Sequence, residues 1–145
     1  MVGAIILKLG ARRGWEAINR RDLEPLLKYV TDGSVLEVPG RPPWGGTFVG
    51  KEAWRAWFDA WFAGLASFRF RVLNEALTRP FALNFTNVVL TEFELEATTH
   101  DGLTFRGRGV DVSEMRRGTY VSDRTYAFDL TDEEGARSTM TPPAL

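Results

Sequence analysis

The stretch that decides the fold is LTFRGRGVDVSEMRRGTYVSDRTYAFD, which runs from Leu103 to Asp129. Two alternating segments flank Arg116-Arg117-Gly118, and this pattern predicts a β-hairpin. Asp111 lies on the first strand between two valines, and Asp123 lies on the second strand at a spacing that can place it opposite Asp111. Two acids that face each other across a mostly apolar hairpin indicate acid–base chemistry in a pocket.

The turn of this hairpin decides which side chains face each other. In a three-residue turn with Gly118 in the left-handed conformation, Asp111 faces Asp123. Two carboxyls at a cross-strand distance of about 5 Å repel unless they share a proton, which raises the pKa of one of them. In a two-residue turn, Arg124 stands opposite Asp111 and forms a salt bridge instead. In the first register, the face with both acids also carries Gly109, Ser113, Val121, Thr125 and Ala127.

Hydrophobic periodicity predicts the other long elements. A helix is predicted over Lys51–Leu65, because large apolar residues recur there at the spacing of one helical face. These residues are Trp54, Trp57, Phe58, Trp61 and Leu65. From Phe68 onward the period is two, and Asp101-Gly102 marks a hairpin turn. The predicted strands are Phe68–Arg79, Leu83–Thr98, Leu103–Met115 and Tyr120–Leu130. Gly107 and Gly109 lie inside the third strand and predict a bulge or tight curvature.

The N-terminal part predicts two helices, a short strand and a loop. The first helix ends near Asn19-Arg20, Asp22 caps the second helix, and Asp32-Gly33 ends it. Val35–Val38 is a short strand, and the Pro/Gly-rich segment Pro39–Gly46 is a loop. The order of elements predicts an α+β domain in which helices pack on one face of a curved, four-stranded antiparallel sheet.

Length and composition limit the classes of function. A chain of 145 residues is expected to form one domain, over residues 1–130, followed by a flexible tail over residues 131–145. The formal net charge of −1 argues against a nucleic-acid partner. The apolar segment Val2–Leu9 is too short to span a bilayer, so no membrane partner is expected. The absence of cysteine fits a cytoplasmic protein.

The same inventory predicts neither a metal nor a cofactor. His100 is the one histidine of the chain and lies in a predicted turn, where a surface position is expected. A single histidine at the surface excludes histidine-based catalytic triads and multi-histidine metal sites. No Gly-rich phosphate loop follows a predicted strand, so nothing in the sequence indicates a nucleotide cofactor.

Three segments carry a family resemblance. They are WEAINRRDLEPLLKYVTDGSVLEVPG (Trp15–Gly40), GTFVGKEAWRAWF (Gly46–Phe58) and FRGRGVDVSEMRRGTYVSDRTYAFD (Phe105–Asp129). In pattern, order and spacing they resemble the nuclear transport factor 2-like superfamily and, within it, the SnoaL-like domains, which include ketosteroid isomerase-like and polyketide cyclase-like proteins. The resemblance implies a cone-shaped half-barrel, whose sheet wraps around an apolar pocket closed by the helices. It also implies a homodimer. The fold hosts isomerases, cyclases, epoxide hydrolases and non-catalytic binders.

The resemblance carries over one functional residue. Asp111 falls where isomerase-like members have an acid that donates to the substrate oxyanion, and where polyketide cyclases have an acid/base. Val38 stands in the place of the isomerase base, and Gly14 in the place of its tyrosine, so a faithful ketosteroid isomerase is not expected. Limonene-epoxide hydrolase has an Arg-x-Asp pair where this chain has Phe93-Glu94-Leu95 and an acid where it has Thr125, so the resemblance to that enzyme fails.

Aromatic and small polar residues are the candidates for the pocket wall. The predicted ligand-binding residues are Trp15, Tyr29, Trp44, Trp57, Phe58, Trp61, Phe85, Phe93, Ser113 and Thr125. The alternative for the helical tryptophans Trp54, Trp57 and Trp61 is a place in the core. Trp44, in the Pro/Gly-rich loop, either plugs the pocket mouth or contacts a second copy.

These observations predict a SnoaL-like protein that binds a small apolar, oxygenated and cyclic molecule. As an enzyme it would work without cofactor or metal, by proton transfer next to a carbonyl in an isomerisation, an aldol-type cyclisation or a dehydration. Asp111 would be the acid/base, and Asp123 would tune its pKa. One alternative is a non-catalytic ligand-binding or dimerisation domain with Asp111 as a buried structural acid. Another is a variant epoxide hydrolase in which both acids activate water.

Overall fold

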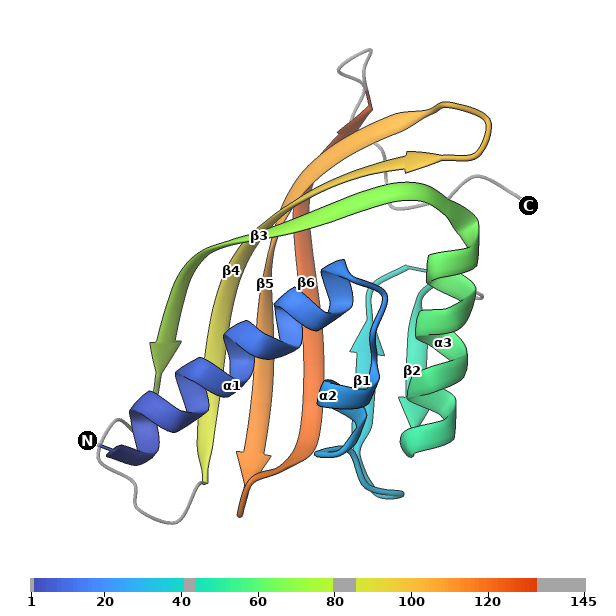
Figure 1. Ribbon diagram of the computed structural model, residues 1–145. Coiled ribbons are helices and arrows are strands. Elements are labelled where there is room, and N and C mark those ends of the chain that lie inside the picture. Colours follow the sequence, from blue (N-terminus) through green and yellow to red (C-terminus); the bar gives the residue numbers. More distant parts are fainter. Residues whose placement is uncertain (1, 41–43, 80–85, 133–145) are drawn as a thin grey trace.

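The computed structural model describes residues 2–40, 44–79 and 86–132 (Figure 1). Within these ranges the chain forms helices, short strands and then long strands. In chain order they are α1 (Val2–Asn19), α2 (Glu24–Leu27), β1 (Val35–Val38), β2 (Gly46–Val49), α3 (Lys51–Gly64), β3 (Leu65–Leu77), β4 (Asn87–Thr99), β5 (Thr104–Arg116) and β6 (Thr119–Asp132). None of the described helices is long and apolar enough to cross a membrane.

The strands form one curved, open sheet. Its order within the described residues is β2-β1-β6-β5-β4-β3, and neighbouring strands are antiparallel except for the parallel pair β1 and β6. Figure 1 shows the long strands β3 to β6 curving behind α1, with α3 at the other side of the concave face. This confirms the predicted α+β fold with a curved antiparallel sheet around N-terminal helices. The strand β2 was not predicted, because it directly follows a Pro/Gly-rich loop.

The helix α3 forms where the aromatic periodicity predicts it. Trp54, Phe58 and Phe62 are buried on its inner side, and the Trp54 indole N–H donates to the carbonyl of Ser34 at 3.3 Å. At the end of α3, the Arg21 guanidinium donates to the carbonyl of Phe62 at 2.6 Å. A cation at this end of a helix also interacts favourably with the helix dipole. The expected helix over Lys51–Leu65 is therefore confirmed to within one residue.

The second helix is shorter than expected. Its N-cap residue is Leu23 and not the predicted Asp22, although Asp22 does accept a hydrogen bond from the backbone N–H of Glu24 at 3.2 Å. The helix ends at Leu27 rather than at Asp32-Gly33, because the backbone N–H of Val30 bonds three residues back to Leu27. A three-residue return of this kind closes a turn and does not extend an α-helix.

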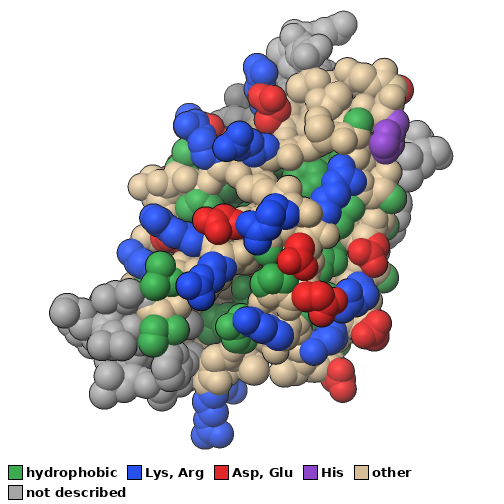
Figure 2. All heavy atoms as spheres, viewed as in Figure 1, with side chains coloured by type: hydrophobic (Ala, Val, Ile, Leu, Met, Phe, Trp, Pro, Cys, Tyr) green, Lys and Arg blue, Asp and Glu red, His purple; other side chains and the backbone are tan. Residues whose placement is uncertain are grey.

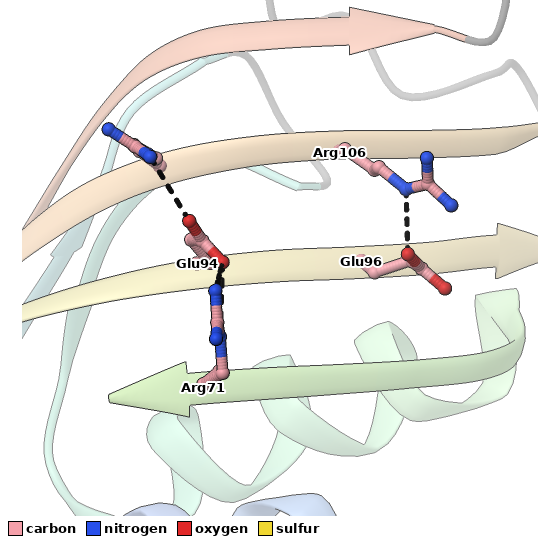
Figure 3. A network of polar contacts seen from close by, with 5 residues as sticks. Arg71, Glu94, Glu96 and Arg106 are labelled. Atoms are coloured by element: carbon pink, nitrogen blue, oxygen red, sulfur yellow. Dashed lines mark hydrogen bonds and ion pairs between the residues drawn. The ribbon is translucent and has the colours of Figure 1, made fainter. Parts of the chain in front are cut away.

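The two faces of the sheet differ in character. On the outer face, Glu94 of β4 pairs with Arg71 of β3 and, at 3.2 Å, with Arg108 of β5, while Glu96 pairs with Arg106 at 2.6 Å (Figure 3). The helix-bearing side of the molecule also mixes basic and acidic side chains (Figure 2). Exposed ion pairs contribute little to stability. Because side chains alternate along a strand, the residues between these charges point to the concave face.

Candidate active site

The hairpin between β5 and β6 has a two-residue turn. Arg116 pairs with Thr119, and the two residues between them have positive φ, 51° at Arg117 and 85° at Gly118. Two successive residues in the left-handed region match the twist of the flanking strands. The three-residue turn predicted from Gly118 is therefore wrong.

A β-bulge follows this turn on β6. Met115 pairs with Tyr120, but the next residue back, Glu114, pairs with Ser122, so Val121 is the extra residue. A bulge shifts the register by one residue, and a shift of one residue reverses the face of every side chain beyond it. The bulge therefore decides which side of β6 faces the concave side of the sheet.

Turn and bulge together give a register that neither prediction contained. Asp111 stands opposite Thr125, and Ser113 stands opposite Asp123. Both predicted partners of Asp111, Asp123 and Arg124, are thus wrong as direct cross-strand pairs. The bulge nevertheless returns Asp123 to the concave face beside Asp111, one step along the diagonal. Arg124 points to the outer face, where it pairs with Glu37 of β1 at 3.0 Å.

The four concave-face residues form one hydrogen-bond network. The Ser113 hydroxyl lies 3.1 Å from Asp111 Oδ2 and 2.5 Å from Asp123 Oδ1, and the Thr125 hydroxyl donates to Asp111 Oδ1 at 3.0 Å. The Ser113 hydroxyl therefore bridges the two carboxyls. Because a serine hydroxyl has one proton to donate, it can bond both carboxyls only when one of them is protonated. The network therefore fits a pair of acids that shares a proton.

Burial favours the protonated form of this pair. Asp111 is 4% exposed, and this burial, followed by the negative charge of Asp123, raises the pKa of Asp111 well above its usual range. Burial also raises the pKa of Asp123, while the hydrogen bond from Ser113 and the interaction with Asp111 lower it in part. Removal from water penalises the charged form, and a second carboxylate nearby adds to that penalty.

This acid network lies in the wall of an apolar cavity of about 440 Å³. A second part of the wall is aromatic. The ring of Trp15 on α1 lies 5.0 Å from that of Phe70 on β3 and 5.2 Å from that of Phe93 on β4, measured between centroids. A cavity of this size with an apolar lining and a few convergent polar groups is typical of small-molecule sites.

The other part of the aromatic wall comes from α3 and the Pro/Gly-rich loop. Trp57 and Trp61 stack at 6.3 Å, and the Trp57 indole N–H donates to the carbonyl of Trp44 at 2.8 Å. The Trp44 ring lies against Gly64, where an added Cβ would be 2.2 Å from the ring. Gly64 therefore makes room for Trp44 in the cavity wall. Trp54 is fully buried in the core, which was the alternative position predicted for the tryptophans of this helix.

Most of the predicted pocket residues line this cavity. They are Trp15, Trp44, Trp57, Phe58, Trp61, Phe93, Ser113 and Thr125, together with Asp111 and Asp123. Tyr29 does not line it: the residue is 39% exposed, and its ring faces the Lys28 ammonium at 4.8 Å. Phe85 lies outside the described residues. Gly14 and Val38, which replace two isomerase groups, do line the cavity and add no polar side-chain atom to it.

Sequence reasoning missed Tyr120, which lines the cavity near both acids. Simple alternation puts Tyr120 on the opposite face from Asp123, and the bulge at Val121 brings it to the same face. The turn residues His100 and Asp101 also reach the exposed edge of the cavity. Among the described residues, no group of three or more acids, histidines or cysteines is arranged to hold a metal ion.

Comparison with known proteins places this geometry in a family. The sequence profile of the SnoaL-like domain matches residues 11–122, which is more than half of the chain. Among curated proteins, no sequence matches significantly.

Three solved structures illustrate the shared fold. Bal32a, from a soil-derived mobile gene cassette, superposes with a TM-score of 0.74 at 20% identity over 88% of this chain and 92% of its own. RV0760c from Mycobacterium tuberculosis, in complex with estradiol-17beta-hemisuccinate, gives 0.67 at 23% identity over 86% and 92%. TerC, co-crystallised with polyporic acid, gives 0.68 at 18% over 86% and 90%. At these identities the likeness establishes the fold.

Proposed function

Because the chain belongs to the SnoaL-like domain family, we propose that it is a cofactor-free enzyme that moves protons on apolar cyclic carbonyl compounds. One observation carries this proposal. The Ser113 hydroxyl bridges Asp111 and Asp123 by hydrogen bonds, and all three residues line an apolar cavity. A pair of carboxyls with one shared proton supplies an acid and a base at the same place.

The two acids take different roles in the proposed reaction. Asp111 holds the shared proton, because it is buried and the Asp123 charge acts on it. Its carboxylic acid keeps its proton and donates a hydrogen bond to the carbonyl oxygen of the bound molecule, while the Asp123 carboxylate removes a proton from the carbon next to that carbonyl. The electron pair of the broken C–H bond forms the enolate. Return of the proton to a different carbon completes an isomerisation and restores the pair of acids.

The composition of the cavity wall favours a flat, apolar ligand with one or a few rings. The aromatic residues Trp15, Trp61, Phe70 and Phe93 form its surface, and its volume of about 440 Å³ lies in the range of small-molecule sites. A structural relative holds estradiol-17beta-hemisuccinate, so this fold accommodates ring systems of steroid size. The substrate class that we propose is therefore a cyclic ketone or enone.

Exchange of carbon-bound protons tests the proposal without knowledge of the natural substrate. We would incubate the protein with 2-tetralone in D₂O and follow deuterium uptake next to the carbonyl by NMR. Wild-type protein is expected to accelerate uptake, and Asp111→Asn and Asp123→Asn are each expected to reduce the rate about 10²-fold or more. The matched control is Glu37→Gln, which removes an exposed acid on the outer face of the sheet.

Two results would overturn the proposed chemistry. Equal exchange in the wild type and both aspartate variants would remove the acids from the reaction. The same measurement would be repeated with a panel of cyclic ketones and enones. If these compounds and 2-tetralone bind but their proton exchange is not accelerated, the non-catalytic ligand-binding domain is favoured. Hydrolysis of simple cyclic epoxides, lost in the same variants, would favour the variant epoxide hydrolase.

The proposal includes a homodimer that works in the cytoplasm. Tyr126 and Phe128 lie on the outer face of β6 and are 54% and 45% exposed, which supports a protein contact on this face. The absence of cysteine supports a reducing compartment. Sedimentation velocity tests the dimer: a monomer at concentrations of about 100 µM would contradict it.

A further inference from the structure

The cavity wall includes a phenol that takes no part in the hydrogen-bond network of the two acids. Tyr120, at the start of β6, lines the cavity together with Asp111 and Asp123. Within the part of the chain that the structure describes, no side chain or backbone group forms a hydrogen bond with the Tyr120 hydroxyl. Tyr120 is half-buried, and its hydroxyl is not among the fully enclosed polar atoms without a partner in the described residues. A hydroxyl at a cavity wall that no protein group engages has its donor available for a bound molecule.

The position of this phenol is fixed from both sides of its backbone. The backbone N–H of Tyr120 donates to the carbonyl of Tyr29 at 2.9 Å, and its carbonyl accepts a hydrogen bond from the Ser34 hydroxyl at 2.6 Å. Its ring packs against the fully buried Trp54, with 5.4 Å between the centroids. A group held in this way loses little conformational freedom when a ligand binds to it.

We infer that the Tyr120 hydroxyl donates a hydrogen bond to the oxygen atom of the molecule bound in the cavity, and that this atom belongs to a neutral carbonyl group. The second part rests on the proposed function. A neutral oxygen fits better than a carboxylate, because the shared charge of Asp111 and Asp123 lies on the same wall and repels anions. Burial and the charges of both acids raise the pKa of Tyr120 well above its usual range, so the phenol keeps its proton.

A pair of matched ligands tests this contact. The probes are 2-tetralone and its hydrocarbon counterpart tetralin, titrated while the fluorescence of the cavity tryptophans is recorded. Tyr120→Phe removes the hydroxyl and keeps the ring on Trp54. We expect it to weaken 2-tetralone binding about three- to tenfold, the loss of one neutral hydrogen bond, and to leave tetralin binding unchanged. The matched control is Tyr126→Phe, which makes the same substitution at an exposed position of the same strand.

Equal affinity of wild type and Tyr120→Phe for 2-tetralone would overturn the inference, as would an equal loss for both probes. A second readout is the infrared carbonyl frequency of bound, ¹³C-labelled 2-tetralone. In the wild type it is expected to lie below its value in hexane, and in Tyr120→Phe it is expected to rise. A frequency equal to that in hexane would also overturn the inference.

Proton exchange in D₂O is measured separately. Exchange that persists with unchanged 2-tetralone binding in Tyr120→Phe refutes the donor and keeps the proposed chemistry. If Tyr120→Phe selectively loses 2-tetralone binding but the wild type does not accelerate exchange, the hydrogen-bond donor is kept and the proposed chemistry is refuted.

Discussion

Gly109 makes room for an aromatic ring of the cavity wall, and its replacement should both destabilise the protein and change the cavity. An added Cβ at Gly109 would lie 2.4 Å from Cζ of Phe93 and 2.8 Å from the carbonyl oxygen of Tyr126. The first atom belongs to a ring that is 3% exposed, and the second to the backbone of the neighbouring strand. Neither atom can move without disturbing packed neighbours.

The size of the effect follows from two opposing contributions. Alanine has an intrinsic advantage over glycine inside a strand of about 0.5–1 kcal/mol. Overpacking a well-filled core costs about 1–3 kcal/mol. Phe93 packs against Trp15 and Phe70, so a displacement of its ring disturbs both contacts. We therefore expect Gly109→Ala to lower the free energy of unfolding by about 1–2 kcal/mol and to weaken the binding of 2-tetralone.

Urea denaturation followed by circular dichroism measures the loss. Gly10→Ala is the matched control, because an added Cβ there meets nothing within 4 Å and the residue lies inside α1. The control should be about 0.5–1 kcal/mol more stable than the wild type. Adding Phe93→Leu to Gly109→Ala should restore part of the lost stability. A Gly109→Ala variant as stable as Gly10→Ala would refute the reasoning.

Three other predictions concern charged groups. Arg21→Ala removes the donors to the carbonyls of Phe62 and Leu65, so urea denaturation should show a loss of about 2 kcal/mol; an unchanged midpoint would contradict this capping role. Because the raised pKa of Asp111 makes the folded state bind more protons than the unfolded chain, wild-type stability should fall as pH rises above about 4. Asp111→Asn should then be more stable than the wild type at pH 8, with the difference closing toward pH 4; parallel pH profiles would argue against a buried acid. Glu94→Gln, on the exposed outer face, should leave the melting temperature and 2-tetralone binding unchanged, and a large shift in either would show that these surface ion pairs matter.

Local sequence patterns sufficed for the elements that are periodic. The aromatic spacing of Lys51–Gly64 predicts a helix with one buried face, and the structure forms that helix. The strand Val35–Val38 was also predicted with its bounds. The glycine pair of β5 predicted a bulge or curvature, and the register of β5 and β6 does shift between Arg106 and Arg108. In contrast, the parallel pairing of β1 with β6 joins distant segments, which no local pattern reveals.

The strand register at the candidate site could not be predicted from the sequence. Alternation predicted that Asp111 and Asp123 would share a face, but it did so through the wrong turn. The actual turn is one residue shorter, and the bulge at Val121 compensates for the change of face. A bulge has no strong sequence signal, since it depends on how two strands pack in the whole sheet. Tyr120 was missed for the same reason, and it would be found only by assuming the bulge.

The central claim is that Asp111 and Asp123 share a proton in the cavity, and a titration of their carboxyl carbons tests it most directly. Protein labelled with ¹³C at the aspartate side chains would be followed by NMR from pH 3 to pH 9, with Asp111→Asn and Asp123→Asn used for assignment. We predict that Asp111 keeps the chemical shift of a protonated acid well above the ordinary pKa of about 3.9, and that Asp123→Asn moves its titration to lower pH. Independent titration of both acids near pH 4 would contradict the account.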